Sequence, residues 1–394
     1  MTIIKIIFWV SLFVIVYSYV GYGILLYFLV RLKNIFKGKK SAVSTTYEPE
    51  VSLVVAAWNE EDFIQAKIDN TLALDYPPEK LQIIFITDGS SDKTPEIISR
   101  NPRFELLHEP ARRGKVAAMN RAIDFVKFPI SVFCDANTLL NKECIRNLAM
   151  HYEDPRVGAV AGEKKIQVPE QGMAAATGEG IYWKYESFLK KLDAQLYSVV
   201  GAAGELFSVR TSLFEKAAED TIIEDFVQSL KVCMKGYVVH YEPKAYAVES
   251  ASLSMRDEQK RKVRICAGAF QAMGILKDLF NVFKYPVLSF QFISHRILRW
   301  TLCPICLCTL LASNLILAVY LRGGFYVGFL FLQLAFYSLA VIGWIYASRN
   351  IKIKFVYIPY YFLFMNLSVF IGFARFIQNR QSVLWEKAAR QKAA

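Results

Sequence analysis

Four apolar runs in this 394-residue chain are each long enough to span a lipid bilayer. They are residues 7–30, 301–321, 325–347 and 355–374. The first has 24 positions without a charge, whereas a signal peptide has a shorter apolar stretch and a small-residue cleavage site. The runs predict an N-terminal transmembrane helix with a basic flank over 1–44 and about three C-terminal transmembrane helices over 301–374.

The charges around these runs predict how the chain is oriented in a membrane. Five positive charges follow the first run, and only Lys5 precedes it. Since cytoplasmic flanks are enriched in Lys and Arg, residue 31 onward is predicted to lie in the cytoplasm, at a plasma or inner membrane. Four spans would then place the basic tail, 375–394, outside. Either the tail breaks the rule or one run is re-entrant, and Pro359 makes the last run the best candidate.

Residues 45–250 have a different pattern, because apolar runs of strand length alternate with helical patterns. This order predicts an α/β domain with a parallel sheet and helices on both faces. The predicted strands are 51–57, 81–86, 104–108, 130–135 and 157–162. Ligands of such sheets bind at the carboxyl ends of the strands. Polar residues fall at these ends, namely Asn59, Glu60, Asp88, Asp135 and Asn137.

Residues 251–300 combine basic and large apolar side chains, which predicts a basic juxtamembrane helix followed by interfacial helices. The stretch 259–264, Gln-Lys-Arg-Lys-Val-Arg, is typical of a face on a lipid surface. The same stretch has the charge to close over a diphosphate. The sequence leaves both explanations open.

Charge and cysteine usage narrow the class of protein. The formal net charge is +12, which suits nucleic acid, anionic lipid or an anionic substrate. The basic residues lie at membrane flanks and in the loop 112–115, without an aromatic–basic stripe, so nucleic acid is excluded. The seven cysteines lack a disulfide framework, which indicates a reducing compartment. Cys303, Cys306 and Cys308 lie in an apolar run and are expected to pack there rather than bind a metal.

Each polar cluster also has an ordinary structural explanation. The turn 87–94 is suited to cap a helix, and the loop 112–115 is either solvated or a phosphate clamp with Lys115 as its point charge. Asp135 and Asn137 form an Asx turn or share a divalent cation through their oxygens. Glu224 and Asp225 stabilise the start of a helix through its dipole, or one of them accepts a proton from a hydroxyl nucleophile.

Taken in order, these clusters resemble the motifs of family 2 glycosyltransferases, in particular the membrane-embedded branch that includes synthases of cellulose, hyaluronan and poly-N-acetylglucosamine. The motifs are VSLVVAAWNEE, YPPEKLQIIFITDGSSDKT, RRGKVAAMNRA, CDANT, GAAGELFSVR and IIEDF. The resemblance covers about residues 48–300 and the membrane arrangement. It implies a GT-A fold, that of nucleotide-diphospho-sugar transferases, joined to transmembrane and interfacial helices.

The resemblance also implies the reaction and the roles of residues. The chain would move a sugar, with inversion, from a nucleotide-diphosphate sugar (a UDP-sugar) to a hydroxyl acceptor, building a polysaccharide and exporting it with accessory subunits. Asn59, Glu60, Asp88, Lys115 and Asp135 would bind the nucleotide sugar. Asp135 and Asn137 would hold Mg²⁺ or Mn²⁺. Asp225, with Glu224, would take the proton, and Glu205, Gln259, Arg261 and Arg264 would contact the diphosphate or the acceptor.

Two departures from the family pattern keep other functions open. Asn137 stands where the family has a second aspartate, and it still offers a carbonyl oxygen. Lys262 and Val263 replace the arginine and tryptophan of Gln-x-x-Arg-Trp, which puts processivity in doubt. One alternative is a single transfer to a polyprenyl-phosphate or lipid-linked acceptor. Another is a non-catalytic nucleotide-sugar-binding subunit, against which the intact acidic motifs argue.

Overall fold

The computed structural model describes most of the chain, in two compact units. The described residues are 1–37, 47–167, 174–250, 255–322, 324–349, 351, 353–380, 382 and 384. The sheet unit is Lys33–Gln167, Trp183–Ala251 and Ser382–Ala394, and the membrane unit is Met1–Leu32, Val168–Tyr182 and Ser252–Gln381. Of the predicted basic segments, Lys39, Lys40, Lys387, Arg390 and Lys392 lie outside the described residues.

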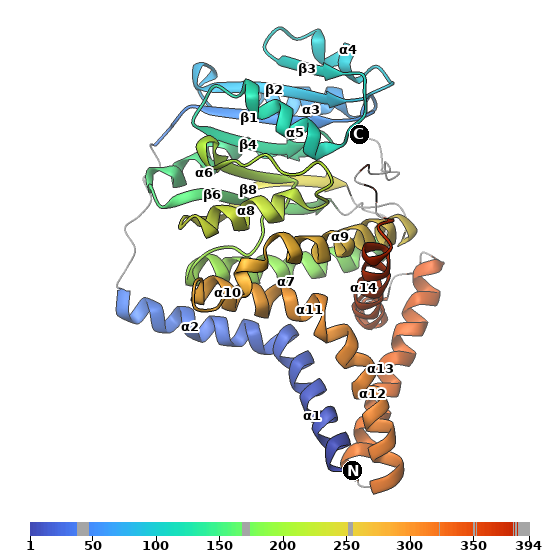
Figure 1. Ribbon diagram of the computed structural model, residues 1–394. Coiled ribbons are helices and arrows are strands. Elements are labelled where there is room, and N and C mark those ends of the chain that lie inside the picture. The colour runs from blue at the N-terminus through green and yellow to red at the C-terminus, as the bar shows by residue number, and fades with distance from the viewer. Residues whose placement is uncertain are drawn as a thin grey trace. The chain divides into compact units, whose positions relative to one another are not determined.

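The sheet unit contains an eight-stranded sheet in the order β3-β2-β1-β4-β7-β6-β8-β5, with β1 lying between β2 and β4 (Figure 1). The strands are β1 (Val51–Ala57), β2 (Leu81–Asp88), β3 (Glu105–Glu109), β4 (Ile130–Asp135), β5 (Thr138–Leu140), β6 (Val157–Gln167), β7 (Leu206–Arg210) and β8 (Val238–Ser250). Strands β1 to β4 pair in parallel. The carboxyl ends of β1, β2 and β4 therefore meet at one edge.

The parallel strands form because their apolar runs are buried on both faces of the sheet. All eight residues of β2 are buried, and β1 is buried except at Ala56. These strands form one core cluster with the helices that cover them, through residues such as Ile64 and Leu148. The predicted α/β class and mostly parallel sheet are confirmed.

The strands β5, β7 and β8 are not predicted by the sequence pattern. Strand β7 is antiparallel to β4 and β6, and β5 is antiparallel to β8. Strand β8 contains Pro243, which normally argues against a strand inside a sheet. The proline falls where the pairing of β6 with β8 shifts register, between Glu242 and Tyr246, so it removes no ladder hydrogen bond.

Each helix of the sheet unit lies between two strands along the chain. They are α3 (Ile64–Leu72), α4 (Thr94–Ser99), α5 (Lys115–Ala122), α6 (Cys144–Ala149), α8 (Glu224–Met234) and the end of α7 (Ala174–Leu196). The sequence predicts a helix start at 59–62, but α3 begins at Ile64 and the acidic residues form a loop. Asn59 has a left-handed backbone, with φ +52°, which ends the strand direction before the helix starts.

The apolar runs form four helices long and apolar enough to cross a membrane: Thr2–Phe36, Leu302–Leu321, Gly324–Ser348 and Phe355–Ile377. They correspond to α1 (Thr2–Val16) with α2 (Tyr22–Lys37), α12 (Leu302–Leu321), α13 (Gly324–Ser348) and α14 (Lys354–Ile377). The segment before them forms α9 (Met255–Ile275), α10 (Pro286–Phe292) and α11 (Leu298–Trp300). Helix α14 continues through Pro359, and whether it crosses or re-enters stays a prediction, as do the segment boundaries.

Substitution of Gly89 by alanine should destabilise the sheet unit more than the same change at Gly236. Both glycines have left-handed backbones, with φ +66° and +91°, and alanine in that conformation costs about 1–2 kcal/mol. A Cβ at Gly89 would also lie 2.5 Å from Cβ of Arg112, whereas nothing lies within 4 Å at Gly236. Thermal unfolding of the detergent-purified variants measures the difference, and equal midpoints for Gly89→Ala and Gly236→Ala would contradict it.

Candidate active site

A small open pocket lies at the carboxyl ends of β1 and β2. It is lined by Ala56, Ala57, Trp58, Asp88, Arg112, Gly114, Lys115 and Ala118. Two of the predicted nucleotide-sugar residues, Asp88 and Lys115, thus share one pocket. They come from β2 and from the start of α5, which the parallel sheet brings to the same edge.

Asp88 holds the loop that forms one wall of this pocket. Its carboxylate accepts backbone N–H groups from Arg113, at 3.1 and 3.2 Å, and from Gly114, at 2.6 Å. The side chain is only 5% exposed. Gly114 precedes the first residue of α5 and has φ +102°, a conformation that glycine adopts without strain. Asp88 therefore fixes where α5, and with it Lys115, begins.

Asn59 and Glu60 join the loop after β1 to the loop after β2. The Asn59 side-chain oxygen accepts the backbone N–H of Ser91 at 2.8 Å, and the Asn59 backbone N–H donates to Ser90 Oγ at 3.1 Å. The backbone N–H of Glu60 donates to Thr94 Oγ1 at 2.8 Å. These bonds fix the two loops against each other, beside the pocket.

Trp58 is a pocket residue that was not among the predicted site residues, and it meets Arg112 of the predicted loop 112–115. The Arg112 guanidinium carbon lies 3.3 Å from the centre of the Trp58 ring, which is a cation–π contact. Partial burial lowers the pKa of Arg112, while Asp88 acts in the opposite direction. A flat aromatic face with a cation beside it suits a nucleobase or a phosphate. The only sequence signal was position, since Trp58 directly follows β1.

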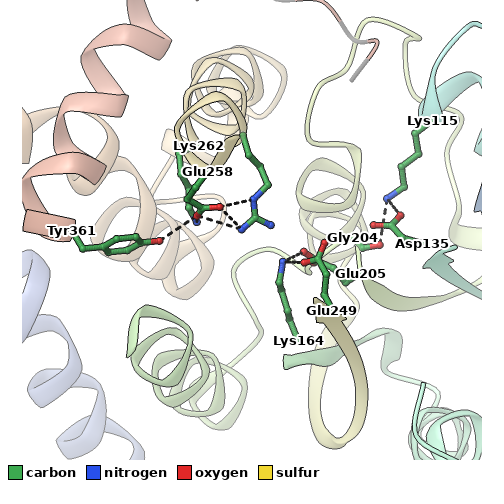
Figure 2. Close-up of polar contacts among 10 residues, drawn as sticks. Lys115, Asp135, Lys164, Gly204, Glu205, Glu249, Glu258, Lys262 and Tyr361 are labelled. Carbon is green, nitrogen blue, oxygen red and sulfur yellow. Dashed lines mark hydrogen bonds and ion pairs between the residues drawn. The ribbon is translucent and has the colours of Figure 1, made fainter. Parts of the chain in front are cut away.

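Lys115 pairs with two of the predicted acidic residues. Its Nζ lies 2.7 Å from Asp135 Oδ1 and donates to the Gly204 carbonyl at 3.3 Å (Figure 2). It also lies 3.4 Å from Glu224 Oε1. A Cβ on Gly204 would lie 3.1 Å from Lys115 Nζ and 3.2 Å from Asp225 Oδ2. The glycine therefore leaves a small space between the ammonium and the Asp225 carboxylate.

The electrostatics of this cluster are those of a site with excess negative charge. Burial alone would lower the pKa of Lys115, but Asp135, Glu224 and Asp225 outweigh it and raise the pKa. Burial raises the pKa of Asp135, against the pull of Lys115. Burial and the neighbouring Glu224 raise the pKa of Asp225 to about 7, again against Lys115. Asp225 is thus a much stronger base than an ordinary aspartate.

The Asp135–Asn137 turn fits a divalent cation. Asn137 Oδ1 is buried and has no hydrogen-bond partner among the described residues. Asp135 supplies a carboxylate two residues away, with a quarter of its side chain exposed. The described residues contain no group of three or more His, Cys, Asp or Glu arranged for a metal. One carboxylate and one amide suit an ion such as Mg²⁺ that takes its other ligands from substrate phosphates and water.

Glu205 belongs to a second buried cluster of the sheet unit (Figure 2). Lys164, on β6, is fully buried and lies 2.5 Å from Glu205 Oε1. Its ammonium also pairs with Glu249 on β8. Glu205 follows Gly204 in the chain and raises the pKa of both Asp135 and Asp225 as a minor cause. Lys164 thus partly neutralises the acidic charge beside the site.

The remaining predicted residues, Gln259, Arg261 and Arg264, lie on α9 in the membrane unit and are partly buried there. Glu258, which is fully buried, accepts a hydrogen bond from Arg261 Nε at 3.2 Å and lies 3.4 Å from Lys262 Nζ. Tyr361 on α14 donates to the same carboxylate at 3.4 Å (Figure 2). The sequence analysis did not single out Glu258 or Tyr361.

Comparison with known families identifies the class. Residues 52–217 match the family model described as "Glycosyl transferase family 2". The chain therefore carries a family 2 glycosyltransferase domain, as its motifs predict.

Two curated relatives agree with this class. The chain is 28% identical over 274 residues to poly-beta-1,6-N-acetyl-D-glucosamine synthase of Staphylococcus aureus strain MSSA476, covering 66% of this chain and 64% of that protein. It is 27% identical over 296 residues to the synthase of Staphylococcus epidermidis, covering 71% and 69%. The matched part thus spans less than two thirds of the Staphylococcus aureus relative.

A solved structure shows the same fold over almost the whole chain. The mannosyltransferase PcManGT from Pyrobaculum calidifontis, in complex with GDP-Man and Mn²⁺, has a TM-score of 0.71 at 22% identity. The similarity covers 95% of this chain and 99% of that one. The predicted GT-A domain with additional membrane helices is confirmed as the fold.

Substitution of Asp88 by alanine should release the Arg112–Gly114 loop. Hydrogen bonds to a charged acceptor each contribute about 1.5–3 kcal/mol, so loss of the acceptor should speed trypsin cleavage after Arg112 and Arg113 at least about tenfold. Mass spectrometry of timed digests identifies these cuts. Asp92→Ala is the matched control, because Asp92 accepts backbone N–H groups in the neighbouring loop. Equal cleavage in both variants would contradict the assignment.

Proposed function

We propose that this chain is an inverting glycosyltransferase that moves a sugar from a nucleotide-diphosphate sugar to a hydroxyl acceptor. The observation that carries the proposal is the cluster around Gly204, where Lys115, Asp135, Glu224 and Asp225 meet beside the pocket at the strand ends. One group of side chains thus holds both the Lys115 ammonium, for the leaving diphosphate, and a carboxylate base for the acceptor hydroxyl.

Asp225 is the proposed general base. The acceptor oxygen attacks the anomeric carbon, the bond from that carbon to the diphosphate oxygen breaks, and the acceptor proton passes to the Asp225 carboxylate. Gly204 carries no side chain that would crowd Asp225 Oδ2, where the acceptor hydroxyl would approach. A pKa of about 7 matches the carboxylate to a proton transfer near neutral pH.

The donor would lie in the pocket between Trp58, Arg112 and Lys115. Lys115 and Arg112 would supply positive charge to the diphosphate. Asp135 and Asn137 would hold Mg²⁺ or Mn²⁺, which when bound offsets the charge that develops on the leaving group. Gln259, Arg261 and Arg264 stay proposed contacts of the diphosphate or acceptor, and Glu205 is a proposed acceptor contact.

For the substrates, we propose a UDP-sugar, N-acetylglucosamine being the first candidate because the named relatives are synthases of its polymer. The acceptor would be a growing polysaccharide, exported past the four candidate spans, with or without accessory subunits. The sheet unit would lie on the cytoplasmic side of a plasma or inner membrane, where nucleotide sugars are made.

A donor panel with the full chain in nanodiscs tests the proposed function. UDP-N-acetylglucosamine, UDP-glucose and GDP-mannose are supplied with Mg²⁺ or Mn²⁺, and the products are read by mass. A ladder of one sugar supports polymer synthesis. A single-sugar product soluble in organic solvent would replace the polymer by a lipid-linked acceptor. Nucleotide-sugar binding without any transfer would overturn the catalytic proposal.

Asp225→Asn should lower kcat about 10²–10⁴-fold, because the amide cannot accept the acceptor proton. The donor KM should change little, since the substitution leaves the pocket lining intact. Initial rates with the active donor measure both parameters. Asp154→Asn is the control, because Asp154 pairs with Arg156 at the surface. An unchanged kcat in Asp225→Asn would remove the base assignment.

The rate should fall on the acid side of pH 7. The Asp225 carboxylate must be ionised to accept a proton, and its pKa is raised to about 7. We therefore expect kcat to level off above pH 7 and to drop about tenfold per pH unit well below it. Burial and the charges of Glu224 and Glu205 raise this pKa, and Lys115 lowers it. Lys115→Met should therefore move the acid limb to higher pH.

The pH profile of kcat in wild type, Lys115→Met and Lys216→Met measures this shift. Lys216 pairs with Asp124 at the surface and should leave the limb in place. If the acid limb of the kcat profile is unchanged in Lys115→Met, or moves to lower pH, the ionisation that causes this limb is not that of Asp225.

A further inference from the structure

Lys67 on α3 is fully buried and lies behind the proposed cation-binding turn. Its ammonium donates to the Thr138 carbonyl at 2.8 Å. Thr138 directly follows Asn137, so the ammonium contacts one end of the turn that contains Asp135 and Asn137.

The environment of the Lys67 ammonium does not offset the free-energy cost of burying a charge with an opposite charge. Its hydrogen-bond acceptor is a neutral carbonyl, and no carboxylate in the described part of the chain lies within ion-pair distance of it. Burial of a charge without an opposite partner destabilises a fold unless hydrogen bonds compensate. Such a local cost is typical of functional sites. The position of Lys67 therefore suggests a role beyond packing.

Asn70, one helical turn further on, holds the next part of the same segment. Its Nδ2 donates to the Leu140 carbonyl at 2.7 Å, and its Oδ1 accepts the Leu140 N–H at 2.8 Å. Residues three apart in a helix lie on the same face, so α3 holds β5 with both side chains. On its other side β5 pairs with β8.

The turn itself is also tightly held, which leaves its ligand oxygens little freedom. The Ala136 N–H donates to the Ala56 carbonyl at 3.1 Å, and Thr138 Oγ1 donates to the Asp135 carbonyl at 2.9 Å. Between these two anchors lies Asn137, whose Oδ1 is buried without a hydrogen-bond partner among the described residues. The polar atom that most needs a ligand is thus on a backbone fixed from several directions.

We propose that Lys67, together with Asn70, is a positioning residue for the divalent cation, holding the Asp135–Thr138 turn so that Asp135 and Asn137 bind the ion as a pair. This inference rests on the proposed function, because it requires the turn to be a cation site. The two helix residues would act as outer partners of the ligands, without touching the cation. Loss of such partners typically weakens metal affinity about 10–100-fold.

Positioning and simple charge repulsion predict opposite effects of Lys67→Met. The ammonium is a positive charge near a cation site, so if repulsion were its only effect, removing it would tighten cation binding. If it positions the turn, removing it weakens binding. Asn70 is neutral, so Asn70→Ala reports the positioning effect without any change of charge.

The test is Mn²⁺ binding to the purified full chain, with UDP or GDP present, followed by the electron paramagnetic resonance signal of free Mn²⁺. Lys67→Met and Asn70→Ala should each raise the Kd for Mn²⁺ about tenfold or more. Binding of the nucleotide in EDTA should stay unchanged, which a general loss of structure would not allow. Lys80→Met is the matched control, because Lys80 also donates to a backbone carbonyl, that of Glu48.

Each outcome decides the proposal. Weaker Mn²⁺ binding in both variants, with Lys80→Met like wild type, supports it. Unchanged binding in both variants, or tighter binding in Lys67→Met with no change in Asn70→Ala, overturns it and leaves the proposed function intact. If wild type binds no Mn²⁺ with either nucleotide, the cation site and this inference both fail. If Lys67→Met does not fold, Asn70→Ala alone decides.

Discussion

The contact between Lys115 and Asp135 is the interaction on which the rest of the proposed site depends. Lys115 is the first residue of α5, and α5 begins where it does because Asp88 binds the N–H groups just before it. The same ammonium reaches Glu224 at the start of α8. Three separate elements of the sheet unit are therefore placed relative to one another by one buried cation and its carboxylates.

This arrangement makes the charge balance of the site the source of its chemistry. Buried carboxylates outnumber the lysines that pair with them, so burial and mutual repulsion raise the pKa values of Asp135 and Asp225. The excess negative charge has two consequences. It favours binding of a further cation, and it gives Asp225 the proton affinity that an aspartate in water lacks. A cation site and a base thus follow from the same physical cause.

The sequence predicted the parts of the fold and site that depend on local pattern. Buried parallel strands give continuous apolar runs, and the polar residues after them must meet at one edge, which placed Asp88 and Asp135 at the same edge of the sheet. Contacts between distant segments have no such pattern. Lys67 lies in a helix whose sequence gives no sign of its contact with the Thr138 carbonyl. Trp58 and Arg112 are far apart in the sequence and meet only in the folded chain. Strand β8 contains Pro243, which normally argues against a strand.

The two departures from the family motifs differ in physical kind. Asn137 keeps an oxygen that is buried and without a partner among the described residues, so the change costs one negative charge and preserves a ligand atom. Lys262 and Val263 are buried within the membrane unit, where Glu258 neutralises the lysine. A Cβ on Gly372 of α14 would lie 2.9 Å from the Val263 carbonyl, so the two helices approach closely there. The second departure therefore lies where α9 and α14 approach closely, and its two side chains are buried there.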